Sequence, residues 1–196
     1  MSRRAGLDKP TVVAAAAALV NREGVAALSL KRLAGELGVQ TPSLYNHVAG
    51  LPGLERELAL LGVQRLGDAL TAAVIGKSGA AAVAALLDAY RSFVTANPGL
   101  AAYTVRPAAL DAPNDVERIQ AETRIMHVAV AVVASFGLMG DDAIHAVRML
   151  RSVVHGFATL EAAGGFGIPL DLDESFRRLV EMVVAGLEQQ AAIARC

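Results

Sequence analysis

The chain has 196 residues, a net charge of −1 and a hydrophobic content of 54%. A chain of this length forms one large domain or one small and one medium domain, and it buries a core without covalent crosslinks. Its single cysteine excludes an intrachain disulfide and indicates an intracellular setting. Because no secretion signal is evident and the apolar runs are too short to span a bilayer, we expect a cytoplasmic protein with no membrane partner.

The charge is unevenly spread along the chain. Residues 1–50 carry six Lys and Arg against three Asp and Glu, a local charge of +3, whereas the remaining residues carry twelve against sixteen. A basic front on an acidic body is consistent with an anionic partner for the front. An ordinary solvated surface explains the same numbers, so charge alone leaves both interpretations open.

Apolar residues recur with a period near 3.6 along the whole chain, and no long window alternates with period two. This pattern predicts an all-α fold of about nine helices. The first helix is expected to end at Gly24. Ser29 then has the position of an N-cap for a second helix over 30–37, which Gly38 ends in the left-handed conformation.

A short third helix follows directly. Thr41 is predicted to cap it and Pro42 to take its first helical position, where the missing amide hydrogen costs nothing. Pro52 is expected to begin the fourth helix, which fades near Gly76. The remaining helices are predicted over residues 78–96, 100–105, from the connector at 106–115 to Phe136, 140–163 and 174–190.

The second and third helices are joined by a short turn that contains Gly38, which is the signature of a helix-turn-helix unit. Ala34 is small enough to let the two helices approach where they cross. The apolar contact between them comes from Leu33, Leu37, Val39 and Leu44. With these residues inside, the polar side chains face outward, as reading of the DNA major groove requires. The outward set is Gln40, Thr41, Ser43, Tyr45, Asn46 and His47.

Two parts of the chain resemble the tetracycline-repressor (TetR) family of transcriptional regulators. "SLKRLAGELGV" and "PSLYNHV" are similar to the second and third helices of its DNA-binding domain, within a match of about 50 residues. "VRMLRSVVHGFATLEAAGGFGIPLDLDESF" is similar to a ligand-binding C-terminal domain found in a subset of the family. The resemblance implies a DNA-binding domain at 1–50 and a helical effector-binding and dimerisation domain at 51–196. It also implies a homodimer on a palindromic double-stranded DNA operator, and usually repression that a small apolar effector relieves.

Base edges and phosphates are within reach of four polar side chains of this unit, Gln40, Thr41, Ser43 and Asn46. Gln and Asn can each pair bidentately with adenine. Tyr45 and His47 match family positions that usually meet the DNA backbone. For Tyr45 a second interpretation is open, in which its ring packs on the domain and only its hydroxyl reaches out.

Four basic residues are candidates for phosphate contacts. Arg3 and Arg4 form either an arm in a neighbouring groove or a disordered start of the chain. Lys31 and Arg32 either line the DNA side of the second helix or belong to a solvated face. The family commonly has a Lys that opens the fourth helix and touches a phosphate, whereas "AGLPGLERE" contains none. The amides at the start of that helix can still bind a phosphate, since they carry partial positive charge.

Broad apolar stripes on the helices over 140–163 and 174–190 each need a partner face. The resemblance implies that these two helices pair across a two-fold axis as a four-helix bundle. The interface residues expected on them are Val147, Val154, Phe176, Leu179, Val183 and Leu187.

Aromatic, Met and polar residues within apolar stretches of the second domain are candidates for the lining of an effector pocket. The candidates are Phe93, Tyr103, Met126, His127, Arg151 and His155. For the two histidines the alternative is a hydrogen-bonded place in the core or the interface. For the aromatic and Met side chains the alternative is plain core.

The sequence indicates no metal site, no cofactor and no catalytic arrangement. The four His are scattered without carboxylates at metal-ligand spacing, and no Gly-rich phosphate loop follows a strand. "GGFG" follows a predicted helix and is interpreted as a helix stop. We therefore predict a regulator and not an enzyme. Two alternatives stay open, a helical dimer that acts only through protein contacts and an enzyme of an unrecognised type.

Overall fold

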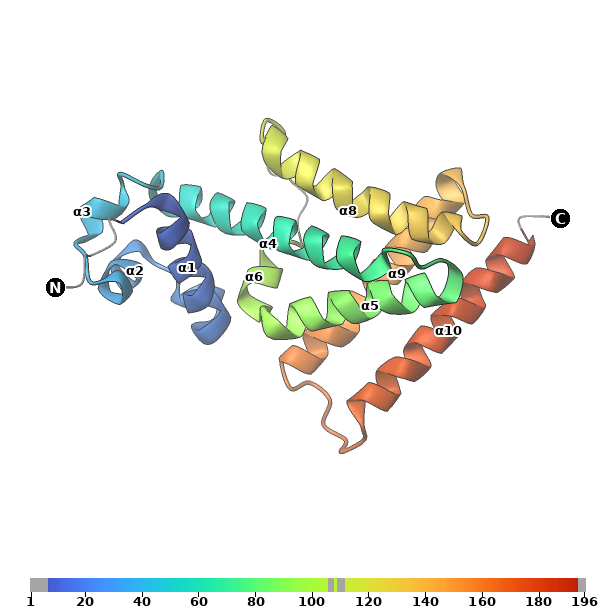
Figure 1. Ribbon diagram of the computed structural model, residues 1–196. Coiled ribbons are helices and arrows are strands. Elements are labelled where there is room, and N and C mark those ends of the chain that lie inside the picture. The colour runs from blue at the N-terminus through green and yellow to red at the C-terminus, as the bar shows by residue number, and fades with distance from the viewer. Residues whose placement is uncertain (1–6, 106–107, 109–111, 194–196) are drawn as a thin grey trace.

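Helices make up all the regular structure that the computed structural model describes, which covers residues 7–105, 108 and 112–193 (Figure 1). The all-α prediction is confirmed. The α-helices are α1 (Lys9–Glu23), α2 (Leu30–Leu37), α3 (Thr41–Leu44), α4 (Gly50–Val74), α5 (Gly79–Ala96), α6 (Pro98–Ala102), α8 (Val116–Ala134), α9 (Gly140–Ala162) and α10 (Leu172–Ile193), with a 3₁₀ turn at Val25–Ala27.

The helices form a small head and a larger body (Figure 1). The head comprises residues 7–49 and holds α1 to α3, and the body comprises residues 50–193. α4 starts at the head and runs the length of the body, where it packs against α8 on one side and α5 on the other. α9 packs against α5 and α8, and α10 crosses α5 and α9 at the far side. The long helices of the body therefore carry the head at one end.

The helix ends follow the predicted capping rules. Asp8 caps α1 by accepting a hydrogen bond from the Thr11 amide at 2.8 Å, and Gly24 ends that helix with a φ of 85°. Ser29 caps α2 through the Arg32 amide at 3.1 Å. Such a cap stabilises a helix by about 1 kcal/mol.

The start of the third helix differs from the prediction by one residue. Gln40 is the N-cap and uses no side-chain hydrogen bond, whereas Thr41 already lies in the helix. The reason is that the first helical hydrogen bond runs from the Ser43 amide to the Gln40 carbonyl at 2.9 Å. α4 likewise begins at Gly50 and not at Pro52, because the Gly53 amide donates to the Ala49 carbonyl at 3.2 Å.

One apolar core continues from the head into the body. Val12, Leu33 and Leu44 of the head belong to the same cluster of buried side chains as Leu87 and Leu187 of the body. Two helices of the head–body junction, α1 and α6, also share hydrogen bonds through one side chain. The Asn21 amide group accepts from the Leu100 backbone amide at 2.8 Å and donates to the Asn97 side chain at 3.2 Å. The orientation of the head is therefore fixed by packing and by polar contacts.

Within the described part of the chain, no helix is both long enough and apolar enough to cross a membrane.

Candidate functional site

The turn between α2 and α3 is held rigidly. Gly38 has a φ of 66° and a ψ of 31°, the left-handed conformation that glycine adopts without strain. Its amide donates to the carbonyls of Ala34 and Gly35, and the Val39 amide donates to Ala34 at 3.0 Å. Ala34 is buried where the helices cross. These contacts fix the angle between α2 and α3.

Two apolar side chains anchor the α3 region and leave its polar side chains outside. Leu44 is completely buried, and Val48 one turn later is buried as well. The side chains of Gln40, Tyr45 and Asn46 are exposed. The remaining polar residues predicted to face outward, Thr41, Ser43 and His47, are half-buried. The sequence "QTPSLYNH" thus forms a protruding edge rich in hydrogen-bonding groups, which is suited to a groove of DNA.

Tyr45 stands out in this edge because it is a large ring in open solvent. Its exposed fraction is 61%, so the ring does not pack on the head.

His47 lies beside Asp8, the cap of α1. The pKa of Asp8 is lowered, mainly by hydrogen bonds from the Thr11 side chain and backbone, and the charge of His47 lowers it further.

The basic residues of the head differ in their partners. Arg32 donates to Glu23 at 2.8 Å and to Glu36 at 3.2 Å, and Arg22 pairs with the same two carboxylates. Lys31 is exposed and forms no ion pair within the described residues. The predicted DNA contacts Arg3 and Arg4 lie outside the described residues.

A cavity of about 360 Å³ lies in the body between α4, α5, α8 and α9. Its wall is mostly aliphatic, because these helices turn their Leu, Val and Ile side chains inward at helical spacing. The apolar lining consists of Val63, Leu66, Leu70, Leu86, Leu87, Ile119, Ile125, Met126, Ala129, Val147, Leu150 and Val154. Tyr90, Thr104, Glu122, Thr123 and Arg151 complete the wall.

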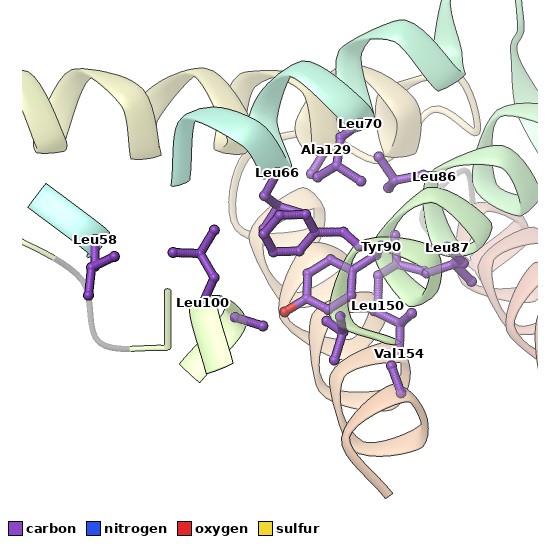
Figure 2. Close-up of a cluster of buried hydrophobic side chains, with 14 of the residues drawn as sticks. Leu58, Leu66, Leu70, Leu86, Leu87, Tyr90, Leu100, Ala129, Leu150 and Val154 are labelled. Atoms are coloured by element: carbon purple, nitrogen blue, oxygen red, sulfur yellow. The ribbon is translucent and has the colours of Figure 1, made fainter. Parts of the chain in front are cut away.

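Tyr90 is the most buried polar side chain of this wall. Figure 2 shows its ring among Leu66, Leu86 and Leu150, with the hydroxyl oxygen directed toward the side where Leu100 lies. The hydroxyl is 3.1 Å from Nδ1 of His155. Burial raises the pKa of Tyr90, although the nearby Arg151 opposes the rise. Tyr90 is therefore a neutral hydrogen-bonding group at neutral pH.

His155 and Arg151 sit one helical turn apart on α9, next to Tyr90. Burial lowers the pKa of His155, and the positive charge of Arg151 lowers it further, so the imidazole is neutral at pH 7. Arg151 donates through Nη2 to the carbonyl of Thr104 at 3.3 Å and to that of Val105 at 3.0 Å. Arg151 is thus held at the edge of the cavity by the chain that follows α6.

The six residues predicted for an effector pocket are only partly brought together. Met126 and Arg151 line the cavity, and His155 reaches it through Tyr90. Phe93 is buried core, and His127 is exposed on another face of α8.

Tyr103, the sixth residue predicted for the pocket, is not part of the cavity wall. Its hydroxyl is buried without a hydrogen-bond partner in the described structure. Burial raises the pKa of Tyr103 to about 12, and the negative charge of Glu55 contributes.

The residues expected at a dimer interface are largely used within the chain. Val154 and Val147 line the cavity, and Phe176, Val183 and Leu187 are buried in the core of the same chain, with Leu179 half-buried beside them. The exposed apolar side chains of this region are different ones. They are Leu160 on α9, Met182 and Ile193 on α10, and Phe166, Ile168 and Leu170 in the segment between the two helices.

Of the five polar residues in the cavity wall, only Arg151 was predicted from the sequence; Tyr90, Thr104, Glu122 and Thr123 were missed. Tyr90 follows Leu86 and Leu87 at helical spacing, so its place on the buried face of α5 could have been read from the periodicity. The role of Glu122 could not be predicted from periodicity, because it depends on the backbone amide of Ala108, which lies outside the helix of Glu122. Glu122 accepts hydrogen bonds from the Ala108 amide at 2.9 Å and 3.0 Å and from Nε of Arg118 at 3.1 Å.

Among the residues that the structure describes, no three His, Cys, Asp or Glu side chains are grouped as ligands of a metal ion would be.

The chain is similar to known transcriptional regulators in sequence and to a solved structure in fold. Residues 83–183 match the family model described as "Tetracyclin repressor-like, C-terminal domain". The chain is 35% identical over 188 residues to the HTH-type transcriptional regulator YobS of Bacillus subtilis, covering 95% of this chain and 96% of the relative. It is 33% identical over 165 residues to the tetracycline repressor protein class A from transposon 1721 of Escherichia coli, covering 81% and 68%. A solved structure of a protein with unknown function from Rhodococcus sp. RHA1 has a TM-score of 0.78 at 30% identity, covering 96% and 99%.

Proposed function

The chain belongs to the tetracycline-repressor family of helix-turn-helix transcriptional regulators, and from this premise we propose that it is a repressor released from DNA by a small molecule. Two observations support the proposal. The head presents Gln40, Tyr45 and Asn46 on a rigidly held edge, and the body contains an apolar cavity. A repressor has to be in the compartment that holds its DNA operator. The proposal therefore assigns the protein to the cytoplasm.

The proposed DNA contact is centred on α3 in the major groove. The single observation that carries it is the contrast between the buried Leu44 and the exposed Tyr45 and Asn46 that follow it. Asn46 and Gln40 are assigned to base edges, and Thr41, Ser43, Tyr45 and His47 to base edges or phosphates. Lys31 is assigned to a phosphate, while Arg32 contributes to the extent that Glu23 and Glu36 release it. The first turn of α4 holds no acidic residue, so its amides keep their partial positive charge for a phosphate.

The proposed assembly is a homodimer on a palindromic operator. Two heads related by a two-fold axis reach half-sites about 34–36 Å apart, one turn of DNA. Support comes from the exposed apolar side chains Leu160, Ile168, Leu170 and Met182 on α9, on α10 and in the segment between them. A second copy would remove this apolar area from water.

The proposed switch is a change in the body that moves the heads. A ligand in the cavity touches α4, α5, α8 and α9, and α4 begins at the head. A ligand shifts the balance between two conformations only by its difference in affinity for them. The proposal therefore requires a cavity that differs between the DNA-bound and the released state.

The test is a fluorescence-anisotropy titration of the full chain with DNA from around its own gene, against unrelated DNA of the same length. We expect sequence-selective binding that weakens as salt rises, because cations on DNA are released on binding. Substituting Tyr45→Ala and Asn46→Ala together is expected to abolish the selectivity without changing the thermal unfolding midpoint. Absence of selective binding would refute the proposal.

The same variant separates the alternative in which the head makes protein contacts only. Under that alternative the DNA affinity of the double variant equals that of the parent chain.

A further inference from the structure

The cavity of the body has the size and lining of a site for one small molecule. Its volume of about 360 Å³ is near the lower end of the range of roughly 300–1,000 Å³ typical of ligand sites. Leu66, Leu86 and Leu150 are among the side chains that make the wall aliphatic. The greater part of a fitting ligand is therefore hydrocarbon.

One cation at the edge of this cavity has no anionic partner. Arg151 forms no ion pair with a carboxylate of the described residues. It donates to the carbonyls of Thr104 and Val105, and it lies close enough to the Tyr90 hydroxyl to act on the pKa of Tyr90. Both bonds to the carbonyls use Nη2. A guanidinium carries five N–H donors, so Nε and Nη1 keep donors for a ligand. The two carbonyls hold the group in place before any ligand arrives, which lowers the entropy lost on binding.

The one carboxylate in the wall is already neutralised. Both oxygens of Glu122 accept from the Ala108 amide, and one of them also accepts from Arg118. Glu122 is therefore a poor partner for a ligand cation, and it does not cancel the charge of Arg151. The cavity as a whole favours an anion.

Tyr90 supplies a second donor beside Arg151. Its hydroxyl oxygen lies 3.1 Å from Nδ1 of His155. His155 is neutral at pH 7 because burial and the charge of Arg151 lower its pKa. Whichever group donates in the bond between Tyr90 and His155, the neutral Tyr90 hydroxyl carries a proton that it can donate to an anionic acceptor, and hydrogen bonds to charged acceptors are the stronger ones.

We propose that the ligand of this cavity is a small apolar monocarboxylic acid. Its carboxylate pairs with the guanidinium of Arg151 and accepts a hydrogen bond from the Tyr90 hydroxyl, and its hydrocarbon part lies along Leu66, Leu86 and Leu150. A planar carboxylate matches the planar guanidinium in two parallel hydrogen bonds. The inference rests on the proposed function only where it takes this ligand to be the effector.

The experiment compares three probes with one hydrocarbon chain and different head groups. Decanoate, decanol and decylamine are titrated into the full chain by calorimetry at pH 7. We expect decanoate to bind at least about tenfold more tightly than decanol, which is the gain of a charge-assisted hydrogen bond, and decylamine to bind most weakly. Failure of decanoate to bind, or equal or tighter binding of decanol or decylamine, overturns the inference.

Two variants and a matched control locate the effect. Arg151→Gln is expected to remove the preference for decanoate over decanol while decanol binding stays the same, and Tyr90→Phe to reduce the preference in part. Arg148→Gln is the control, because Arg148 is exposed on the same helix and does not line the cavity. Retention of the preference in Arg151→Gln, or its loss in Arg148→Gln, contradicts the assignment.

A parallel DNA titration keeps this inference separate from the proposed function. Decanoate that binds the free protein but leaves its DNA complex intact supports the ligand class and refutes the proposed switch. Release of DNA by a neutral or cationic compound, with no binding of decanoate, supports the proposed switch and refutes the ligand class.

Discussion

Gly99 of α6 lies directly against the carbonyl of Val20 at the end of α1. A Cβ atom on Gly99 would lie 2.1 Å from that oxygen and 2.8 Å from the Asn21 amide nitrogen. Because both neighbours are backbone atoms, they cannot move aside as a flexible side chain can. Because Gly99 has no side chain, α6 of the body can pack directly against α1 of the head.

Replacing Gly99 by Ala is therefore expected to separate α6 from α1. We expect the free energy of unfolding to fall by about 1–3 kcal/mol, as in overpacked cores, or more because backbone must shift. Denaturant unfolding measures the loss. Gly156→Ala is the matched control, since Gly156 is also helical but has nothing within 4 Å of its Cβ position. The control should be neutral or slightly stabilising. A Gly99→Ala protein as stable as the parent would show that the junction is not tightly packed.

Arg56 and Asp115 form a second link, between the start of α4 and the start of α8. The guanidinium donates to both carboxylate oxygens, at 2.6 Å and 2.7 Å, and the Asp115 side chain is only 8% exposed. Asp115 also caps α8 through the Arg118 amide at 3.2 Å. Asp115→Asn keeps a capping oxygen and removes the charge, which isolates the ion pair.

A double-mutant cycle with Arg56→Gln and Asp115→Asn measures this link. We expect a coupling free energy of roughly 0.5–3 kcal/mol, toward the lower half because Arg56 is one-third exposed. A second cycle with Lys9→Gln and Glu57→Gln serves as the comparison, since Lys9 is half-exposed in its ion pair with Glu57 and is expected to couple more weakly. Additive effects of Arg56→Gln and Asp115→Asn would contradict the argument.

The same pair makes stability depend on pH in the acid range. The hydrogen bonds from Arg56 hold the pKa of Asp115 below its usual value in the folded chain. The stabilisation is fully present above the unfolded pKa of about 4 and is lost as the pH falls through the lower, folded pKa. We expect the free energy of unfolding of Asp115→Asn to fall less steeply than that of the parent between about pH 6 and pH 3. Parallel curves from urea unfolding would argue against this titration.

Much of the head could be predicted from sequence because its signals are local. Ser29 and Gly38 bound α2 by capping rules that operate within four residues, and the burial of Leu44 follows from helical spacing. The cavity could not be predicted in the same way. Tyr90, Arg151 and Glu122 come from α5, α9 and α8, and only the packing of these helices brings them to one wall. An apolar stripe such as that of α10 predicts burial, but it does not say whether the same chain or a second copy covers it.

Tyr103 carries a buried hydroxyl without a partner in the described structure. A buried polar group without a hydrogen bond costs about 1–3 kcal/mol. Tyr103→Phe keeps the ring and removes the hydroxyl, so we expect the free energy of unfolding to be unchanged or to rise. Denaturant unfolding tests this, with Tyr90→Phe as the control that loses a made hydrogen bond and is expected to be less stable. A clear loss of stability in Tyr103→Phe would mean that the hydroxyl is satisfied.

Under the proposed DNA contact, the carboxylates beside Arg32 compete with DNA phosphates for its charge. Arg32 and Arg22 both pair with Glu23 and Glu36, whereas Lys31 has no carboxylate partner in the described chain. The logarithm of the DNA affinity falls with the logarithm of salt concentration, with a slope of about −0.9 per phosphate neutralised. Lys31→Ala is expected to make this slope shallower by about that amount. Glu23→Gln with Glu36→Gln is expected to raise the affinity for all DNA sequences and to steepen the slope, because the released guanidiniums reach phosphates. A slope that neither change alters would place this face of α2 away from the DNA.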